Sequence, residues 1–193
     1  MIDYITQIDF NILYWIQENL KCAFLDFLMP LVGTMQDLGI FWICIGLALM
    51  IPKKTRYCGM AVLIAMLVDT IMLEYGAKFI FTRVRPCNLV NDVDMLIPKP
   101  NSYSFPSNHS ASAFAAAVAV AMTVKSKVGI ASGFVVSSLI AFSRVYCFVH
   151  YPSDVIVGVI AGSLIGFVVC VVMKKSGFKR FLERKNFIEK EIV

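Results

Sequence analysis

The stretch VIVGVIAGSLIGFVVCVVM, residues 155–173, has no charged side chain and is long enough to cross a lipid bilayer as one helix. Other stretches without Asp, Glu, Lys or Arg precede it, at 38–52, 57–68, 100–124 and 128–143. Only 16% of the 193 residues are charged and 59% are hydrophobic, whereas a soluble domain usually has roughly a quarter charged residues. The sequence therefore predicts an integral membrane protein and excludes a soluble enzyme, a disordered chain and a collagen-like chain.

These apolar stretches predict an all-α fold, a helical bundle with five to six transmembrane helices. We expect the helices at about 36–51, 57–80, 108–124, 128–146 and 153–173. The apolar segment 23–35 contains Asp26, Pro30 and Gly33, so it is interpreted either as a sixth short span or as a broken re-entrant piece.

The N-terminal segment repeats apolar residues at helical spacing, and its first twenty residues hold acidic but no basic side chains. It therefore lacks the basic start of a cleavable signal. The pattern predicts an N-terminal interfacial helix on the bilayer surface, with a plain surface helix as the alternative.

Basic residues gather on one side of the expected bundle: Lys53, Lys54, Arg56, Lys125, Lys127 and the tail 174–193. The positive-inside rule makes that side and the C-terminal tail cytoplasmic, and it places the opposite loops on the extracytoplasmic face. The basic residues therefore indicate membrane orientation and not nucleic-acid binding. We expect one membrane-embedded domain over residues 1–193, with the informative region at about 57–173.

Lys78, Arg85 and Arg144 are expected on the extracytoplasmic side, each at the end of a span. Ionisable groups at membrane depth are costly, so such a cluster indicates a functional site. Guanidinium groups match phosphate oxygens, and the free N–H groups of the helix that starts near Ser107 and Asn108 add to an anion site. The sequence therefore predicts a phosphate-binding pocket.

Both histidines of the chain, His109 and His150, fall in these same junctions. His150 precedes Asp154 by four residues, a spacing at which a carboxylate can hold one ring nitrogen and leave the other as a nucleophile. His109 is then available to protonate the leaving oxygen. The cysteine spacing fits no metal motif, so we expect phosphoryl transfer with no metal and no other cofactor.

The residues just described resemble the three-part signature of the PAP2 (type 2 phosphatidic acid phosphatase) superfamily. The blocks are Lys78 to Arg85-Pro86, then Pro106 to His109, then Ser143-Arg144 with His150 and Asp154. The resemblance implies that His150 forms a phosphohistidine, that Asp154 supports it and that His109 protonates the leaving group. It also implies that Lys78, Arg85, Ser107 and Arg144 hold the phosphate. Asn108 replaces the usual glycine, and because Asn tolerates left-handed backbone angles, we expect the anion contact to survive.

We therefore expect a membrane lipid phosphatase, similar to small enzymes that convert undecaprenyl pyrophosphate to the monophosphate. The alternatives are a phosphatidate or phosphatidylglycerophosphate phosphatase and, from another class, a non-catalytic anion or lipid carrier. The expected partners are a lipid phosphate or pyrophosphate substrate and membrane lipids, with no nucleic acid and no obligate protein partner.

Three residue interpretations stay open at this stage. Lys78 lies four residues after Glu74, so a helical ion pair is the alternative to phosphate binding. Arg83 matches no motif position and is interpreted as a loop or interface charge. A disulfide between Cys87 and Cys147 is conceivable.

Overall fold

The computed structural model describes residues 2–177, and over that range the protein is entirely helical apart from turns and loops. The elements are α1 (Ile2–Asn19), α2 (Ala23–Met35), η1 (Asp37–Gly39), α3 (Ile40–Met50), α4 (Arg56–Asp69), η2 (Thr70–Ala77), α5 (Lys78–Phe81), η3 (Pro86–Asn88), α6 (Asn108–Thr123), α7 (Lys127–Tyr146) and α8 (Pro152–Lys175). Here η1 and η3 are 3₁₀ turns, whereas η2 is a π-helical continuation of α4. The predicted all-α class is confirmed.

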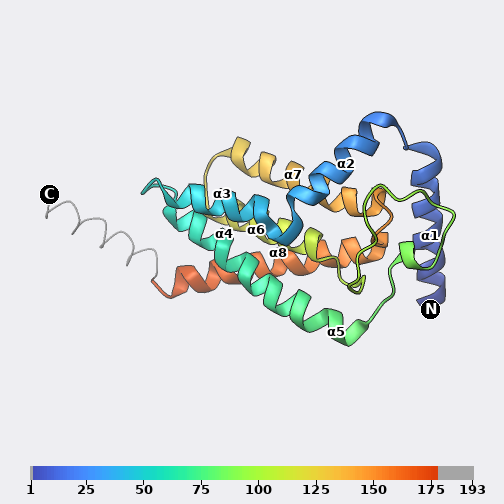
Figure 1. Ribbon diagram of the computed structural model, residues 1–193. Coiled ribbons are helices and arrows are strands. Elements are labelled where there is room, and N and C mark those ends of the chain that lie inside the picture. Colours follow the sequence, from blue (N-terminus) through green and yellow to red (C-terminus); the bar gives the residue numbers. More distant parts are fainter. Residues whose placement is uncertain (1, 178–193) are drawn as a thin grey trace, which may run out of the picture.

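Helix α6 forms the centre of the bundle and packs against α4, α7 and α8. Figure 1 shows these helices running side by side, with α1 lying across one end of the bundle. Alanine and serine make up most of α6, and its alanines from 111 to 119 are almost all fully buried. Small side chains let neighbouring helices approach closely, which is how helices associate where lipid replaces water.

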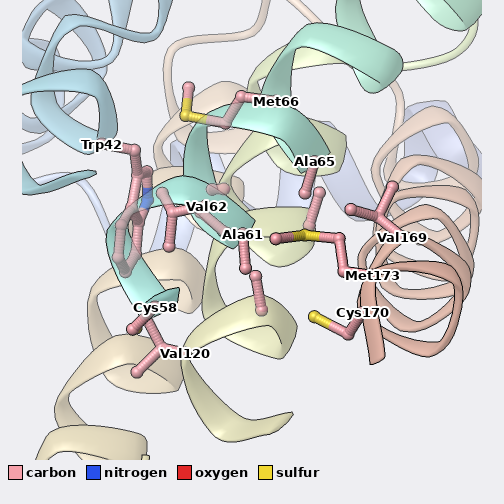
Figure 2. Packing of buried hydrophobic residues seen from close by; sticks show 14 of the residues in the cluster. Trp42, Cys58, Ala61, Val62, Ala65, Met66, Val120, Val169, Cys170 and Met173 are labelled. Atoms are coloured by element: carbon pink, nitrogen blue, oxygen red, sulfur yellow. The ribbon is translucent and has the colours of Figure 1, made fainter. Parts of the chain in front are cut away.

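Glycines on α8 provide the other half of this close packing. Gly158, Gly162 and Gly166 lie against the backbone of Ser107, Ala111 and Ala115, so closely that a Cβ on Gly162 would lie 2.0 Å from the Ala111 carbonyl oxygen. A larger core of Trp42, Val62, Met66, Val120 and Met173 fills the space between α3, α4, α6 and α8 (Figure 2). The start of α8 is thereby held directly against the start of α6.

Three helical stretches are long and apolar enough to span a bilayer: Arg56–Phe81, Lys127–Tyr146 and Pro152–Lys175. A fourth candidate is the pair Ala23–Met35 and Asp37–Met50, which is bent by 54° at the break between its two parts. Length and hydropathy thus support three to four spans, fewer than the five to six expected. The difference arises at α6, which has only 16 residues, and at the segments 23–35 and 36–51, which combine into one bent unit.

The N-terminal helix α1 keeps a row of large apolar side chains exposed. Tyr4, Ile5, Ile8, Ile12 and Trp15 face outward, while Leu13 and Ile16 on the same helix are buried against the bundle. This distribution suits a helix between the protein and a lipid surface, and its interfacial position stays a prediction. Residues 178–193 of the expected basic tail lie outside the described residues.

We expect Gly162→Ala to lower the free energy of unfolding by about 1–3 kcal/mol, because the added methyl group collides with the backbone of α6 and forces the two helices apart. Denaturant unfolding in detergent micelles measures the loss. Gly129→Ala is the matched control, since the nearest atom to its added Cβ is 3.5 Å away, an ordinary contact. Equal stability of the two variants would show that the α6–α8 approach does not limit stability.

Candidate active site

Three junctions that are distant in the sequence meet at one end of the bundle. They are the loop after α5, the start of α6, and the turn between α7 and α8, all at the end where α1 lies (Figure 1). A cavity of about 900 Å³ opens there. Lys78, Arg85, Asn108, His109, Arg144 and His150 all line it. The structure thus brings together most of the residues that the sequence singled out.

His150 is buried and its two ring nitrogens have different partners. Its Nε2 lies 2.9 Å from an Nη1 of Arg85. A guanidinium group can only donate, so Nε2 accepts this bond and the ring proton resides on Nδ1. Burial, followed by the positive charge of Arg85, holds the pKa of His150 well below its ordinary value. The imidazole is therefore neutral at neutral pH, with a lone pair on Nε2 at the cavity.

Asp154 reaches His150 through a serine hydroxyl. The His150 Nδ1 lies 3.7 Å from Asp154 Oδ2, beyond hydrogen-bond distance. The Ser104 hydroxyl stands between them, 3.4 Å from Nδ1, and donates to Asp154 Oδ2. Ser104 is fully buried. The relay keeps the proton on Nδ1, and the sequence offered no signal for it because Ser104 lies in the long loop before α6.

Asp154 itself is fixed by contacts from several directions. Its carboxylate accepts a bond of 3.1 Å from the backbone N–H of Tyr151, at the start of α8, and one of 2.5 Å from Arg83 Nη1. The other Nη of Arg83 lies 2.9 Å from Asp9 of α1, and the guanidinium stacks 3.7 Å from the ring centre of Tyr151. Arg83 lies in the loop between α5 and η3, as the sequence suggested, and there it forms an ionic bridge between two buried carboxylates.

Arg85 is held rigidly at the cavity by backbone and hydroxyl oxygens. Its Nε donates to the Ser102 carbonyl at 2.7 Å, its Nη2 to the Ser102 hydroxyl at 2.9 Å, and its Nη1 to the Val149 carbonyl at 2.9 Å. Burial lowers the pKa of Arg85 to about 10. The guanidinium therefore stays charged at neutral pH in a fixed orientation, which suits recognition of an anion.

Arg144 has a donor without a partner. Its side chain is only 4% exposed, and its Nε lies 3.3 Å from the Ser143 hydroxyl. Its Nη2, however, has no hydrogen-bond partner among the residues that the structure describes. An unpaired buried charge is costly. Helix α2 makes room for this group at Gly33, where a Cβ would fall 1.6 Å from Nη2. An anion in the cavity would satisfy this donor.

The remaining predicted phosphate contacts differ in their present partners. Lys78 forms an ion pair of 2.6 Å with Glu74, the alternative that its spacing suggested, and it also lines the cavity. The side-chain oxygen of Asn108 is buried without a partner. Ser107 is not part of the cavity wall, because its hydroxyl bonds to that of Ser110 at 2.9 Å beneath the start of α6.

His109 also lines the cavity, with its Nε2 2.9 Å from Asp37 Oδ1 of η1. The nearest charge to His109 is thus negative, whereas the nearest to His150 is positive. A carboxylate favours the protonated form of an imidazole and a guanidinium disfavours it. No pattern in the sequence predicts the contact of Asp37 with His109, because only the folded chain brings η1 to α6.

Beyond the charged groups, the cavity becomes apolar. Leu38, Ile43, Leu63, Met66 and Leu67, from η1, α3 and α4, form this part of the wall. The loop residues from Ile97 to Ser102 also line the cavity. A site with cations and two histidines at one end and an apolar channel at the other matches a ligand with an anionic head and an apolar tail. Cys87 and Cys147 are both buried free thiols, so no bridge closes this region.

The fold and site define a helical membrane protein with a cavity where three junctions meet, lined by cationic side chains and two histidines. The chain belongs to the PAP2 superfamily, which matches residues 54–178. The resemblance based on the three motif blocks is thereby confirmed.

Two curated relatives are similar to the chain. An undecaprenyl-diphosphatase of Sulfolobus acidocaldarius is 36% identical over 126 residues, which cover 65% of this chain and 60% of that protein. A decaprenylphosphoryl-5-phosphoribose phosphatase of Mycobacterium tuberculosis is 30% identical over 135 residues, which cover 67% of this chain and 70% of that protein. The chain therefore matches less than two thirds of the length of the Sulfolobus protein.

Two crystal structures share the fold. Aquifex aeolicus LpxE superposes with a TM-score of 0.72 at 24% identity, covering 83% of this chain and 93% of that one. The first transmembrane PAP2 type phosphatidylglycerolphosphate phosphatase from Bacillus subtilis gives a TM-score of 0.65 at 24% identity, with 89% and 95% covered.

We expect Arg83→Gln to lower the free energy of unfolding by on the order of 3 kcal/mol, because Asp9 and Asp154 lose their shared cation while buried. Denaturant unfolding measures this loss. In a double-mutant cycle, Asp9→Asn combined with Arg83→Gln should cost less than the sum of the single changes. Lys54→Gln, at an exposed turn, is the control with an expected change below about 0.5 kcal/mol. Additive losses at positions 9 and 83 would contradict the bridge.

Proposed function

We propose that the protein is a membrane phosphatase that removes a phosphate group from a lipid phosphate or diphosphate through a phosphohistidine on His150. The observation that carries the proposal is the buried, neutral imidazole of His150, whose Nε2 lone pair lies at a cavity with Arg85, Arg144 and Lys78. Cations gather around the place where phosphoryl oxygens would sit, and a nucleophile is adjacent. The whole chain acts in this proposal as one membrane-embedded domain.

The first step follows from the positions of these groups. A bound phosphate takes over the Arg85 donor that now rests on Nε2 and satisfies the open Nη2 of Arg144. The freed Nε2 lone pair forms the N–P bond as the bond from phosphorus to the leaving oxygen breaks, and His109 supplies the proton that this oxygen needs. The Ser104 hydroxyl and the Asp154 carboxylate stabilise the positive charge that develops on the His150 ring at Nδ1–H. Ser107 stays a predicted phosphate contact, and its hydroxyl, which lies 2.9 Å from that of Ser110, is at the start of α6 beside the free backbone N–H groups.

The second step returns the enzyme to its starting state. His109, now neutral, accepts a proton from a water molecule, the water oxygen forms a bond to phosphorus, and the N–P bond breaks. Inorganic phosphate leaves, and His150 regains its neutral form. No group of three or more His, Cys, Asp or Glu in residues 2–177 is arranged to hold a metal ion. We propose that the arginines and lysine compensate the phosphate charge, so the reaction uses no metal or other cofactor.

We propose a polyprenyl diphosphate, such as undecaprenyl pyrophosphate, as the main substrate. Support comes from the two curated relatives, because the names of both include a polyprenyl lipid. The apolar wall of η1, α3 and α4 continues from the charged pocket and suits a tail that enters sideways from the bilayer. Phosphatidate and phosphatidylglycerophosphate are the alternative substrates.

We also propose that the pocket opens on the extracytoplasmic face. The turns from α3 to α4 and from α6 to α7 lie at the opposite end of the bundle from the three junctions (Figure 1). Those turns hold Lys53, Lys54, Lys125 and Lys127. By the positive-inside rule that end is cytoplasmic, and so is the C-terminal tail that follows α8.

We expect His150→Gln to lower phosphate release from every lipid substrate by a factor on the order of 10³ or more, because no other group at the cavity can replace the attacking imidazole. The measurement is release of inorganic phosphate from a panel of polyprenyl and glycerol lipids, each as monophosphate and diphosphate. An acid-labile phosphoenzyme should form in the wild type and be absent in the variant.

The same variant separates the enzyme from a non-catalytic carrier. A carrier would retain lipid phosphate binding and transport in His150→Gln, and its wild type would release no phosphate. Wild-type chemical activity that survives in His150→Gln would instead contradict the phosphohistidine step.

We expect kcat/KM to fall on the acid side of its pH profile (the acid limb) only below pH 6.5. The ordinary pKa of histidine is about 6.5. Neutral His150 is the attacking form, and its lowered pKa keeps it neutral as the pH falls through that range. Arg85→Gln removes a nearby positive charge, so the limb should move to higher pH in that variant. Two substrates whose phosphates ionise at different pH separate this limb from ionisation of the substrate. A limb above pH 6.5 with both substrates would contradict a neutral His150.

A further inference from the structure

The break between α2 and α3 has an unusual backbone. Leu38 has φ +55° and Gly39 has φ +72°, and the two helices are bent by 54° across this point. A left-handed conformation is costly for a leucine. Leu38 is also 90% exposed, so its own side-chain packing does not hold it there. Such strain persists only where the surroundings enforce it.

Two neighbouring side chains of the break dock on the start of α6. Gln36 is 1% exposed and its amide donates to the Ser112 hydroxyl at 3.0 Å. Asp37 Oδ1 lies 2.9 Å from His109 Nε2. His109 and Ser112 are three residues apart on one helix, so they share a face of α6. The break is therefore clamped at two adjacent points, one of which is a histidine at the cavity.

The charges around His109 come from several elements. Burial disfavours its protonated form most, and the positive charges of Arg144 on α7 and Lys78 on α5 add to this effect. Glu74 on η2 is engaged by Lys78. His150 is neutral. Asp37 is thus the carboxylate in direct contact with His109, and it opposes the cations that would strip the ring of its proton.

We propose that Asp37 is a positioning residue that favours the protonated form of His109 and fixes its ring so that Nδ1–H is the donor to the leaving oxygen. The inference rests on the proposed function and deepens it. The carboxylate holds Nε2–H throughout, while the Nδ1 proton passes to the oxygen of the P–O bond as His150 Nε2 bonds to phosphorus. The two histidines then work in opposite senses: His150 is held at Nδ1 and attacks from Nε2, whereas His109 is held at Nε2 and donates from Nδ1.

This role places a part of the machinery outside the residues that define the family match. Asp37 precedes residue 54, where the match to the PAP2 superfamily begins, and it is presented by the strained turn η1. The 54° break is then more than an interruption of a span, because a straight helix would not bring Asp37 and Gln36 together onto α6.

The test is Asp37→Asn, assayed against substrates with poor and good leaving groups. We expect activity on an alkyl lipid phosphate at neutral pH to fall about 10-fold or more, since general acid catalysis contributes about 10²–10⁴-fold and depends on the protonated ring. Activity on p-nitrophenyl phosphate should fall less than about 3-fold, because its leaving oxygen needs no proton. The basic limb of kcat against pH should move to lower pH in the variant.

Controls make each outcome decisive. Asp37→Glu should recover most of the lipid phosphatase activity, and His109→Ala should show the same leaving-group pattern as Asp37→Asn. Asp92→Asn makes the same chemical change at a carboxylate that pairs with Tyr14 away from the cavity wall, so its activity should match the wild type.

Equal losses on both substrates with an unmoved basic limb would assign Asp37 a structural role only and overturn the proposal, as would unchanged activity. If Asp37→Asn does not fold, Asp37→Glu becomes the test. The proposal then requires that the basic limb of kcat and the dependence of activity on the leaving group in Asp37→Glu match those of the wild type. A wild type that releases no phosphate from any substrate would instead refute the proposed function.

Discussion

The close approach of α6 and α8 is the constraint on which the rest of the site depends. Gly158, Gly162 and Gly166 let α8 lie directly on the α6 backbone, and at the site end the Ser107 N–H donates to the Asp154 carbonyl at 3.2 Å. The first residues of both helices are thereby held together without bulky side chains between them. His109, at the start of α6, and His150, just before α8, line one cavity because the two helix starts lie against each other.

The two histidines of that cavity differ in their burial and in the sign of the nearest charge. His150 is completely enclosed and touches a guanidinium, whereas His109 is partly open and touches a carboxylate. Burial disfavours the protonated form of both imidazoles, and the nearest charge adds to that effect at His150 but opposes it at His109. Within residues 2–177, a buried nitrogen of Arg144 has no hydrogen-bond partner, so it can donate to an anion at the cavity.

The N-terminal helices contribute more than membrane attachment. Asp9 on α1 shares Arg83 with Asp154, Gly33 on α2 makes room for Arg144, and Asp37 in η1 contacts His109. Asp9, Gly33 and Asp37 precede the region matched to the family. The motif residues are therefore supported by side chains from a part of the chain that carries none of the motifs, and variation there would alter the site without changing its signature.

The sequence by itself determined the all-helical membrane fold, the approximate bounds of α4 to α8 and most of the motif residues that line the cavity, because hydropathy and motif spacing are local along the chain. It did not reveal the bent α2–α3 unit, the bridging role of Arg83, the Ser104 relay or the pairing of Asp37 with His109. It also could not exclude Ser107 from the cavity wall. These features depend on which side chains from distant segments meet, and that is decided by helix packing and backbone geometry at a few turns, for which a single sequence holds no periodic signal.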